Sequence, residues 1–257
     1  MKVFKELYNY RELLKNNIKK EIRGKYKGSW LGILWTFLNP LLMLAVYSFV
    51  FPYILRVNVE NYSIFMTVAL IPWNFFTTAI QMGTGSVVAN GNILKKVYFP
   101  REIIPISITT SQLVNFLITC LIMFAFIIFS GVGFSYHALL FPLLIVIQYL
   151  IILAFNLILS AMTVFVRDID HFVSVILMLG FYATPIVYQA NMLPEKFQWV
   201  LKLNPMAQLV EAYRSIFYYH QMPDWNMLGI WGIASFVFII MGYRIFKKLE
   251  KSFVEEL

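Results

Sequence analysis

Long uncharged tracts separated by short polar connections dominate the chain. Five tracts contain no Asp, Glu, Lys or Arg: Gly28 to Leu55, Asn61 to Leu94, Ile103 to Val166, His171 to Pro194 and Trp225 to Tyr243. A helix needs about 20 residues to cross a bilayer core of about 30 Å. The third tract is long enough for two crossings, and Gly131, Gly133 and His137 interrupt it near its middle. The pattern therefore predicts an all-α integral membrane protein with six transmembrane helices.

The composition agrees with this class. Hydrophobic residues make up 60% of the 257 residues and charged residues only 13%, a more apolar balance than a soluble domain of this size carries. Six spans and their connections use up the chain, so we expect a single membrane domain without an attached soluble enzyme. Its predicted parts are an amphipathic segment 1–27, a six-span bundle 28–246 and a tail 247–257. The single cysteine, Cys120, excludes a disulfide framework and a cysteine metal site.

The net charge of +8 follows a topological pattern. Of the 21 Lys and Arg residues, 17 lie in residues 1–27, in the connection after the second tract, at Arg167 or in the tail. The positive-inside rule makes these segments cytoplasmic, which places both termini inside and residues 189–225 outside. The excess charge suits membrane lipids with anionic headgroups, and no nucleic-acid partner is expected.

The N-terminal segment has an amphipathic pattern. Its apolar stripe at helical spacing consists of Val3, Leu7, Tyr10, Leu14, Ile18 and Ile22. Such a helix lies in the membrane interface, either as a generic anchor or as a docking surface for a cytoplasmic partner. It is not a signal peptide, because charges run through the whole segment and no apolar region precedes Gly28.

Two connections predict short helices. After the second tract, Asn90 and Asn92 can cap a helix over residues 93–99 that Pro100 ends. This segment is either a contact for a partner or a loop whose cations enforce topology. In the connection 189–225, one helix is expected from Pro194 to Lys202. A second is expected from the cap pair Asn204 and Pro205 towards Tyr219. Both are too short to span, and we expect two external re-entrant helices, or else interfacial helices without a gating role.

Several segments match a known family in the same order along the chain. They are Arg23 to Trp35 with Leu38-Asn39-Pro40, Ile71 to Phe76, Lys95 to Pro105, Arg167-Asp168-Ile169, Pro185 to Tyr188, and Leu203-Asn204-Pro205 through Arg214. Together they resemble the permease subunits of ABC exporters for polysaccharides such as O-antigen, capsule or teichoic acid. The resemblance covers nearly the whole chain and implies two copies of this permease with two separate ATP-binding subunits. It also implies a bacterial or archaeal cytoplasmic membrane as the location.

The chain lacks the phosphate-binding motif G-x-x-x-x-G-K-[ST], so it cannot hydrolyse ATP by the usual P-loop route. The prediction is a transport permease rather than an enzyme. No cofactor is expected on this chain, and ATP and Mg belong to the partner subunit.

The resemblance and the charge pattern give three sets of candidate residues. The expected ATPase contact comprises Asn92, Ile93, Leu94, Val97, Tyr98, Pro100, Arg101, Arg167 and Asp168. An anionic substrate headgroup is expected at Arg23, Lys25 and Lys27. The expected external gate comprises Pro194, Phe197, Asn204, Pro205, Glu211 and Arg214, in which Glu211 and Arg214 can pair at i, i+3.

The predicted function is the transmembrane subunit of an ATP-driven exporter for a lipid-linked polysaccharide or polyol-phosphate polymer. One alternative is an ABC exporter for a small lipid or drug. Another is a secondary carrier or intramembrane enzyme, but these classes use ionisable groups within the membrane, whereas His137 lies in the connection between the third and fourth spans and His171 at the edge of the fifth. Aromatic residues are 18% of the chain. Some of those in the first, second and fifth spans could face a channel for sugars.

Overall fold

The computed structural model describes residues 8–24, 28–54 and 56–257, and every regular element in these ranges is a helix. The α-helices are α2 (Arg11–Gly24), α3 (Trp35–Phe49), α4 (Tyr62–Thr84), α5 (Ser86–Ala89), α6 (Gly91–Lys96), α7 (Ile103–Phe129), α8 (Phe141–Phe165), α9 (Ile169–Ala183), α10 (Gln198–Leu203), α11 (Pro205–Phe217), α12 (Trp225–Leu249) and α13 (Phe253–Glu256). A π-helical turn, Val50–Ile54, extends α3. The all-α class predicted from the sequence is confirmed.

Five helical stretches of the described chain are long and apolar enough to cross a membrane. They are Trp35–Ile54, Tyr62–Thr84, Ile103–Phe129, Tyr136–Phe165 and Trp225–Ser252. The third tract divides as predicted, because Gly131 and Gly133 take positive φ angles of 78° and 73° in the turn between α7 and α8. The chain is therefore a multi-pass membrane protein.

The fifth tract does not form a full-length span. Its helix α9 has only 15 residues, equivalent to about 22 Å. The helix stops at Ala183 because Pro185 disfavours helical backbone at Thr184, which is extended with φ −104° and ψ 133°. The tract supplies a short helix followed by an irregular segment, and the count of six spans is not confirmed.

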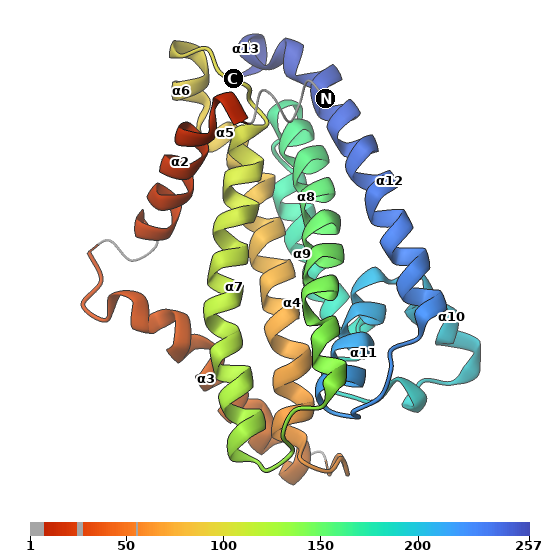
Figure 1. Cartoon of the computed structure of the whole chain (residues 1–257). Helices are drawn as coiled ribbons and strands as arrows, with labels where there is room; N and C mark the ends of the chain where they lie inside the picture. Colours follow the sequence, from red (N-terminus) through yellow and green to blue (C-terminus); the bar gives the residue numbers. More distant parts are fainter. Residues whose placement is uncertain (1–7, 25–27, 55) are drawn as a thin grey trace.

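Figure 1 shows α4, α7 and α8 side by side through the length of the molecule, with α12 along one flank and, on the other, α2 in the upper part and α3 in the lower part. The short helices α5, α6 and α13 lie at one end, called the α6 end below, and α11 lies towards the other, called the α11 end. Helix α4 forms the centre of the bundle. In its most apolar stretch of 18 residues 72% is buried, compared with 6% in the corresponding stretch that contains α3.

A polar contact fixes three central helices. Asn156 of α8 donates through Nδ2 to the carbonyl of Ala79 at 3.0 Å and to Thr109 Oγ1 at 2.8 Å. This places its amide against Gly83 of α4, where a methyl group would overlap the side chain. Glycine is required at this position for the two helices to approach this closely.

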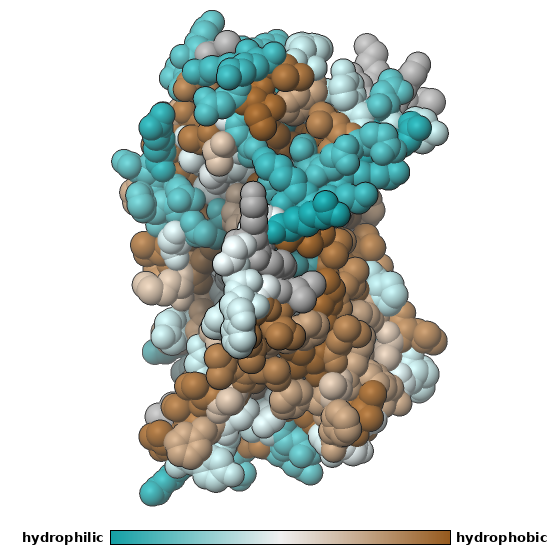
Figure 2. All heavy atoms as spheres, turned by 90° about the vertical axis from the view of Figure 1, so that its left-hand side faces the viewer, coloured by the Kyte–Doolittle hydropathy of each residue, from teal (hydrophilic) through white to brown (hydrophobic). Residues whose placement is uncertain are grey.

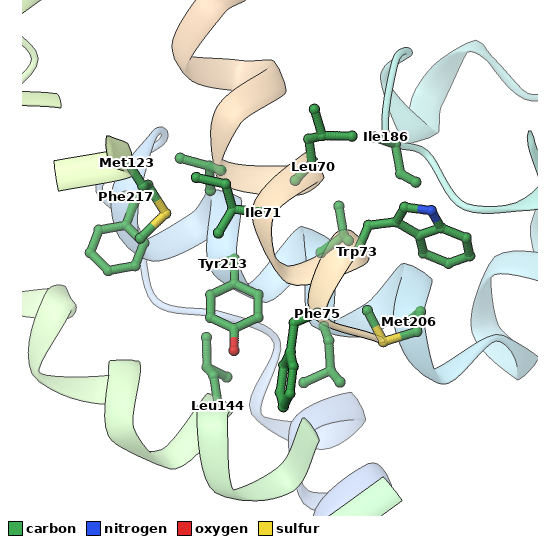
Figure 3. Close-up of a cluster of buried hydrophobic side chains, with 14 of the residues drawn as sticks. Leu70, Ile71, Trp73, Phe75, Met123, Leu144, Ile186, Met206, Tyr213 and Phe217 are labelled. Carbon is green, nitrogen blue, oxygen red and sulfur yellow. The ribbon is translucent and has the colours of Figure 1, made fainter. Parts of the chain in front are cut away.

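Helix α11 packs into the protein interior and not only onto its surface. In Figure 3, Tyr213 and Phe217 of α11 lie among Ile71 of α4, Met123 of α7 and Leu144 of α8. The phenol of Tyr213 donates to Gln148 Oε1 at 2.9 Å, and Gln148 Nε2 donates to the carbonyl of Pro72 at 2.8 Å. A buried helix at this position is consistent with a re-entrant element.

Helix α2 has the two faces predicted from its sequence. Leu13, Leu14, Ile18 and Ile22 are half-buried, whereas the Lys and Arg side chains of the helix are exposed. In Figure 2 its hydrophilic residues form a band that borders a broad hydrophobic area below it. Val3 and Leu7 of the predicted stripe lie outside the described residues. The arrangement fits an interfacial helix.

Candidate translocation surface and its two ends

A groove of about 590 Å³ lies between α3, α4 and α9. Its lining residues are Met43, Tyr47, Leu70, Trp73, Asn74, Thr77, Thr78, Gln81, Met82, Ser174, Leu177, Met178, Phe181 and Tyr182. None of these residues carries a charge. The groove lies between the three spans for which the sequence suggested channel-facing aromatic residues.

Aromatic rings from all three helices meet in the groove. Phe181 of α9 stacks on Tyr47 of α3 with their centroids 6.1 Å apart, and Trp73 of α4 meets Phe181 edge-on at 6.2 Å. Tyr182 beside them is 70% exposed. Flat rings of this kind offer apolar faces to a sugar without binding it strongly.

Neutral polar groups complete the groove. Gln81 of α4 donates through Nε2 to Asp170 Oδ1 at 3.0 Å and accepts from Ser174 Oγ at 2.9 Å, so its amide is held in one orientation. Asn74 and Thr77 lie on the same wall. Amides and hydroxyls can exchange hydrogen bonds with hydroxyl-rich molecules in either direction. Within the described residues, no cluster of His, Cys, Asp and Glu could hold a metal ion.

A second cavity of about 240 Å³ continues from the groove between α3, α4 and α7. Asn74 and Thr78 line both spaces. Gln112 and Asn115 of α7 add two further amides, and Asn115 is buried with its Oδ1 lacking a hydrogen-bond partner. The interior beside α3 is thus polar but uncharged along much of its length.

The α6 end holds the residues expected to contact an ATPase. Asn92, Ile93, Val97 and Tyr98 are exposed, and Tyr98 reaches 93%. Leu94 is buried and anchors the helix instead of offering a surface. Pro100 and Arg101 are half-buried.

The predicted helix over residues 93–99 is wrong in both boundaries. Helix α6 begins at Gly91, which places Asn92 inside it, and ends at Lys96, after which Val97 is extended. Asn90 precedes the helix, but its side chain donates to the carbonyl of Ser86 and does not cap α6. The early end has a tertiary cause, because Phe99 turns inward and is buried.

Arg167 and Asp168 lie in the exposed turn between α8 and α9. This turn is at the α6 end, since Phe165 just before it contacts the ring of Phe253 at 6.2 Å. The structure therefore brings the two predicted parts of the ATPase contact to the same end of the molecule.

The candidate headgroup residues are only partly described. Arg23 is exposed in the last turn of α2, a position that favours a cation beside the helix C-terminus. Lys25 and Lys27 lie outside the described residues. On the same helix, the hydrogen bond from Lys15 to Glu12, 3.0 Å long, holds the pKa of that carboxyl below its usual value.

The predicted external gate forms two short helices, as expected. Pro194 precedes a 3-10 turn that contains the partly exposed Phe197 and leads into the six residues of α10. Asn204 caps α11 by accepting from the backbone of Met206 at 3.0 Å and of Ala207 at 3.3 Å, and Pro205 occupies the first turn.

Arg214 is the most heavily bonded residue of this region. Its guanidinium donates to Glu211 Oε1 at 2.9 Å and to the carbonyls of Phe65, Pro185 and Ile186. It also lies 3.4 Å above the ring of Phe65 and is fully buried. The predicted pairing with Glu211 is confirmed, but the arginine chiefly joins α11 to α4 and to the irregular segment after α9.

Sequence reasoning missed a buried ion pair at the α6 end. Lys247 of α12 lies 2.8 Å from Glu102 Oε2 and 3.0 Å from Glu250 Oε1. Glu102 is fully buried directly before α7. The sequence does show Glu102 directly before a long apolar tract, which signals a buried charge. It does not show the partner, because Lys247 is 145 residues away.

Comparison with known proteins agrees with this geometry. The pattern that defines the ABC-2 type transporter family matches residues 12–218. The O-antigen export system permease protein RfbA of Myxococcus xanthus is 36% identical over 259 aligned positions that cover 100% of both chains. A protein of the same name from Klebsiella pneumoniae is 35% identical over 93% of this chain and 92% of its own length. The chain belongs to the ABC-2 type transporter family.

Proposed function

We propose that this chain is the transmembrane subunit of an ATP-driven exporter that moves a lipid-linked polysaccharide across the cytoplasmic membrane. The observation that carries the proposal is the uncharged groove between α3, α4 and α9, which is lined by a cluster of aromatic rings and by amides and hydroxyls. The names of the relatives, which are O-antigen export permeases, support the same substrate class.

The groove chemistry favours a neutral glycan over a polyol-phosphate polymer. A phosphate-containing polymer would need cations along its path to offset the cost of removing its charges from water. The described groove lining has none. Sugars need only ring faces and exchangeable hydrogen bonds, which let successive units slide.

A separate ATP-binding subunit is proposed at the α6 end, where it would hold the ATP and Mg. Ile93, Val97 and Tyr98 present apolar surface there, and Lys95 and Lys96 flank it with exposed charge. Arg167 and Asp168 add a second contact at the same end. This proposal places the α6 end, and both termini, in the cytoplasm.

A second copy of this chain is proposed to close the groove. Helix α3 buries only 6% of its apolar window, and α9 exposes Phe172, Ile176 and Leu179 by 59 to 66%. The groove opens between these two helices, so a symmetric partner would enclose a channel. Arg23, Lys25 and Lys27 are proposed to attract the anionic headgroup of the lipid carrier.

Single-cysteine labelling tests the orientation. In a Cys120→Ser background, Lys196→Cys and Lys248→Cys place reporters at exposed positions of the α11 end and the α6 end. An impermeant reagent added to intact cells should label position 196 and reach position 248 only after permeabilisation. The reverse pattern would contradict the proposed orientation.

Substrate-stimulated ATP hydrolysis tests the groove. The permease, purified with its ATP-binding subunit and placed in lipid nanodiscs, should hydrolyse ATP faster when a lipid-linked glycan is added. Tyr182→Ala should reduce this stimulation at least about threefold, because it removes a ring that contacts the sugar. Tyr136→Ala is the matched control, since Tyr136 is 69% exposed but lies outside the groove. Equal stimulation in both variants would exclude the groove as the glycan path.

A further inference from the structure

We propose that the C-terminal segment 250–257 positions α6, so that the contact with the ATP-binding subunit depends on it. The inference rests on the proposed docking at α6, but its structural basis is independent of that function. The sequence suggested a cytoplasmic tail separate from the bundle. In the structure this segment folds back onto the α6 end.

Helix α6 cannot hold its own shape. It has six residues, whereas isolated helices shorter than about 12 residues are marginal in water. Its side chains offer little anchorage, because Leu94 is the one large apolar side chain of α6 that is buried. The position of the exposed Ile93 and of the following Val97 therefore depends on what packs around the helix.

The C-terminal segment supplies part of this packing. Phe253 is fully buried in a cluster that includes Leu94, Phe99 and Val87. Its ring meets Phe246 of α12 edge-on with centroids 5.5 Å apart. The segment thus shares one apolar core with α5, α6 and the loop that follows.

The contact reaches the first residue of α6. A methyl group on Gly91 would lie 3.3 Å from Cδ2 of Leu257 and 3.7 Å from its Cβ. Gly91 itself is buried. A larger residue at position 91 would push Leu257 away from the helix.

Charged side chains connect the C-terminal segment to the loop that follows α6. Arg101 donates to the backbone carbonyl of Glu250 and lies 5.8 Å from the ring centroid of Phe253. Lys247 joins Glu102 and Glu250. The C-terminal segment therefore contacts Gly91, the first residue of α6, and Arg101 in the loop after the helix, which fixes the surface between these two residues.

An engineered disulfide tests this placement directly. The Cβ separation of 3.7 Å between positions 91 and 257 is within the range of natural disulfides. In a Cys120→Ser background, Gly91→Cys with Leu257→Cys should crosslink under mild oxidation. Gly91→Cys with Gly229→Cys is the control and should not crosslink, because Gly229 lies near the start of α12 at the opposite end. Absence of the 91–257 crosslink would overturn the placement.

Coupling to ATP hydrolysis tests the positioning role in the complex with the ATP-binding subunit. Phe253→Ala should lower glycan-stimulated hydrolysis at least about fivefold, and Phe253→Leu should retain most of it. In the Phe253→Ala protein, oxidation of the cysteine pair at 91 and 257 should restore stimulation and reduction should abolish it again. A merely structural loss would not respond to the crosslink.

A second variant leaves the Phe253 side chain in place. Gly91→Leu should displace Leu257 and reduce stimulation, whereas Gly229→Leu should not, since no atom lies within 4 Å of a methyl group there. Full stimulation in both Gly91→Leu and Phe253→Ala would overturn the inference. If the wild-type permease in complex with its ATP-binding subunit shows no glycan-stimulated hydrolysis, the proposed function fails. The crosslink between positions 91 and 257 still reports whether the C-terminal segment lies where the structure places it.

Discussion

A fully buried charge lies at each end of the helical bundle, and the two are satisfied to different degrees. Arg214 at the α11 end has Glu211, three backbone carbonyls and an aromatic ring as partners. Glu102 at the α6 end has Lys247 on one oxygen, and its Oε1 has no hydrogen-bond partner among the described residues. Arg214 therefore has partners on all sides, whereas Glu102 has a partner for only one of its two carboxylate oxygens.

The difference indicates which end can move. Shifting Arg214 breaks several bonds at once, and each leaves a polar group without a partner inside a membrane protein. Shifting Glu102 exchanges one ion pair, and its partner Lys247 is 29% exposed and keeps Glu250 as a second partner. We infer that the α11 end acts as a fixed frame and that the α6 end takes up motion from a docked subunit.

The largest loss of stability is expected for Arg214→Met. It leaves three carbonyls and the partly exposed Glu211 without the donor that the buried guanidinium supplies, which should cost about 3 to 5 kcal/mol. Arg214→Lys should recover little, because one ammonium cannot reproduce the planar donor array. Thermal unfolding of the purified protein measures both effects. A melting temperature of Arg214→Met close to that of wild type would contradict the inference that Arg214 makes the α11 end a fixed frame.

A smaller loss of stability is expected for a substitution in the middle of the bundle, between the α6 end and the α11 end. Gly83→Ala should destabilise the protein by about 1 to 3 kcal/mol, because the added methyl group overlaps Asn156. Combining it with Asn156→Ala should recover part of the loss through the space released, although the bonds to Ala79 and Thr109 are gone. Thermal unfolding of the single and double variants gives the coupling between the sites. Additive losses would show that the two residues do not touch.

Glu102→Gln should cost less, about 0.5 to 1.5 kcal/mol, since Lys247 retains Glu250. Glu102→Gln should reduce glycan-stimulated ATP hydrolysis more strongly than it reduces stability, because the ion pair of Glu102 and Lys247 joins the α6 loop to α12. The ratio of ATP hydrolysed with and without glycan, measured beside the melting temperature, separates the two. A stability loss as large as that of Arg214→Met would show that the ends are held equally firmly.

The smallest stability change is expected for Val97→Asp. Val97 is 57% exposed in extended backbone, so the change should stay within about 0.5 kcal/mol. Binding of the ATP-binding subunit should nevertheless be lost, because a charge enters the apolar contact. Co-purification measures it, with Tyr136→Asp as the control, because Tyr136 is 69% exposed and lies in the connection between α7 and α8, away from the α6 end. An intact complex with unchanged stimulated hydrolysis would exclude the α6 contact.

Local patterns predicted the α11 end well. Asn204 with Pro205 reads as a helix start, and Glu211 with Arg214 as an i, i+3 pair, because all four residues belong to one element. The long-range partners of Arg214 are not visible in the sequence. Phe65 is 149 residues away, and its carbonyl carries no side-chain signal.

The α6 end was predicted less accurately for the same reason. Pro100 suggested that the helix runs to Phe99, but burial of Phe99 beside Phe253 ends it at Lys96. The sequence predicted a tail from residue 247, whereas Lys247 lies in α12 and pairs with Glu102. Tertiary packing between distant segments decides both features, and no local periodicity records it.

Transport in proteoliposomes tests the central claim most directly. The permease and its ATP-binding subunit, reconstituted with a lipid-linked glycan on the side of the α6 end, should move the glycan to the opposite side only when ATP is hydrolysed. The movement should stop when the ATP-binding subunit is omitted and should not respond to a proton gradient. Transport by the permease alone, or transport driven by the proton gradient without ATP, would contradict the account and support a secondary carrier.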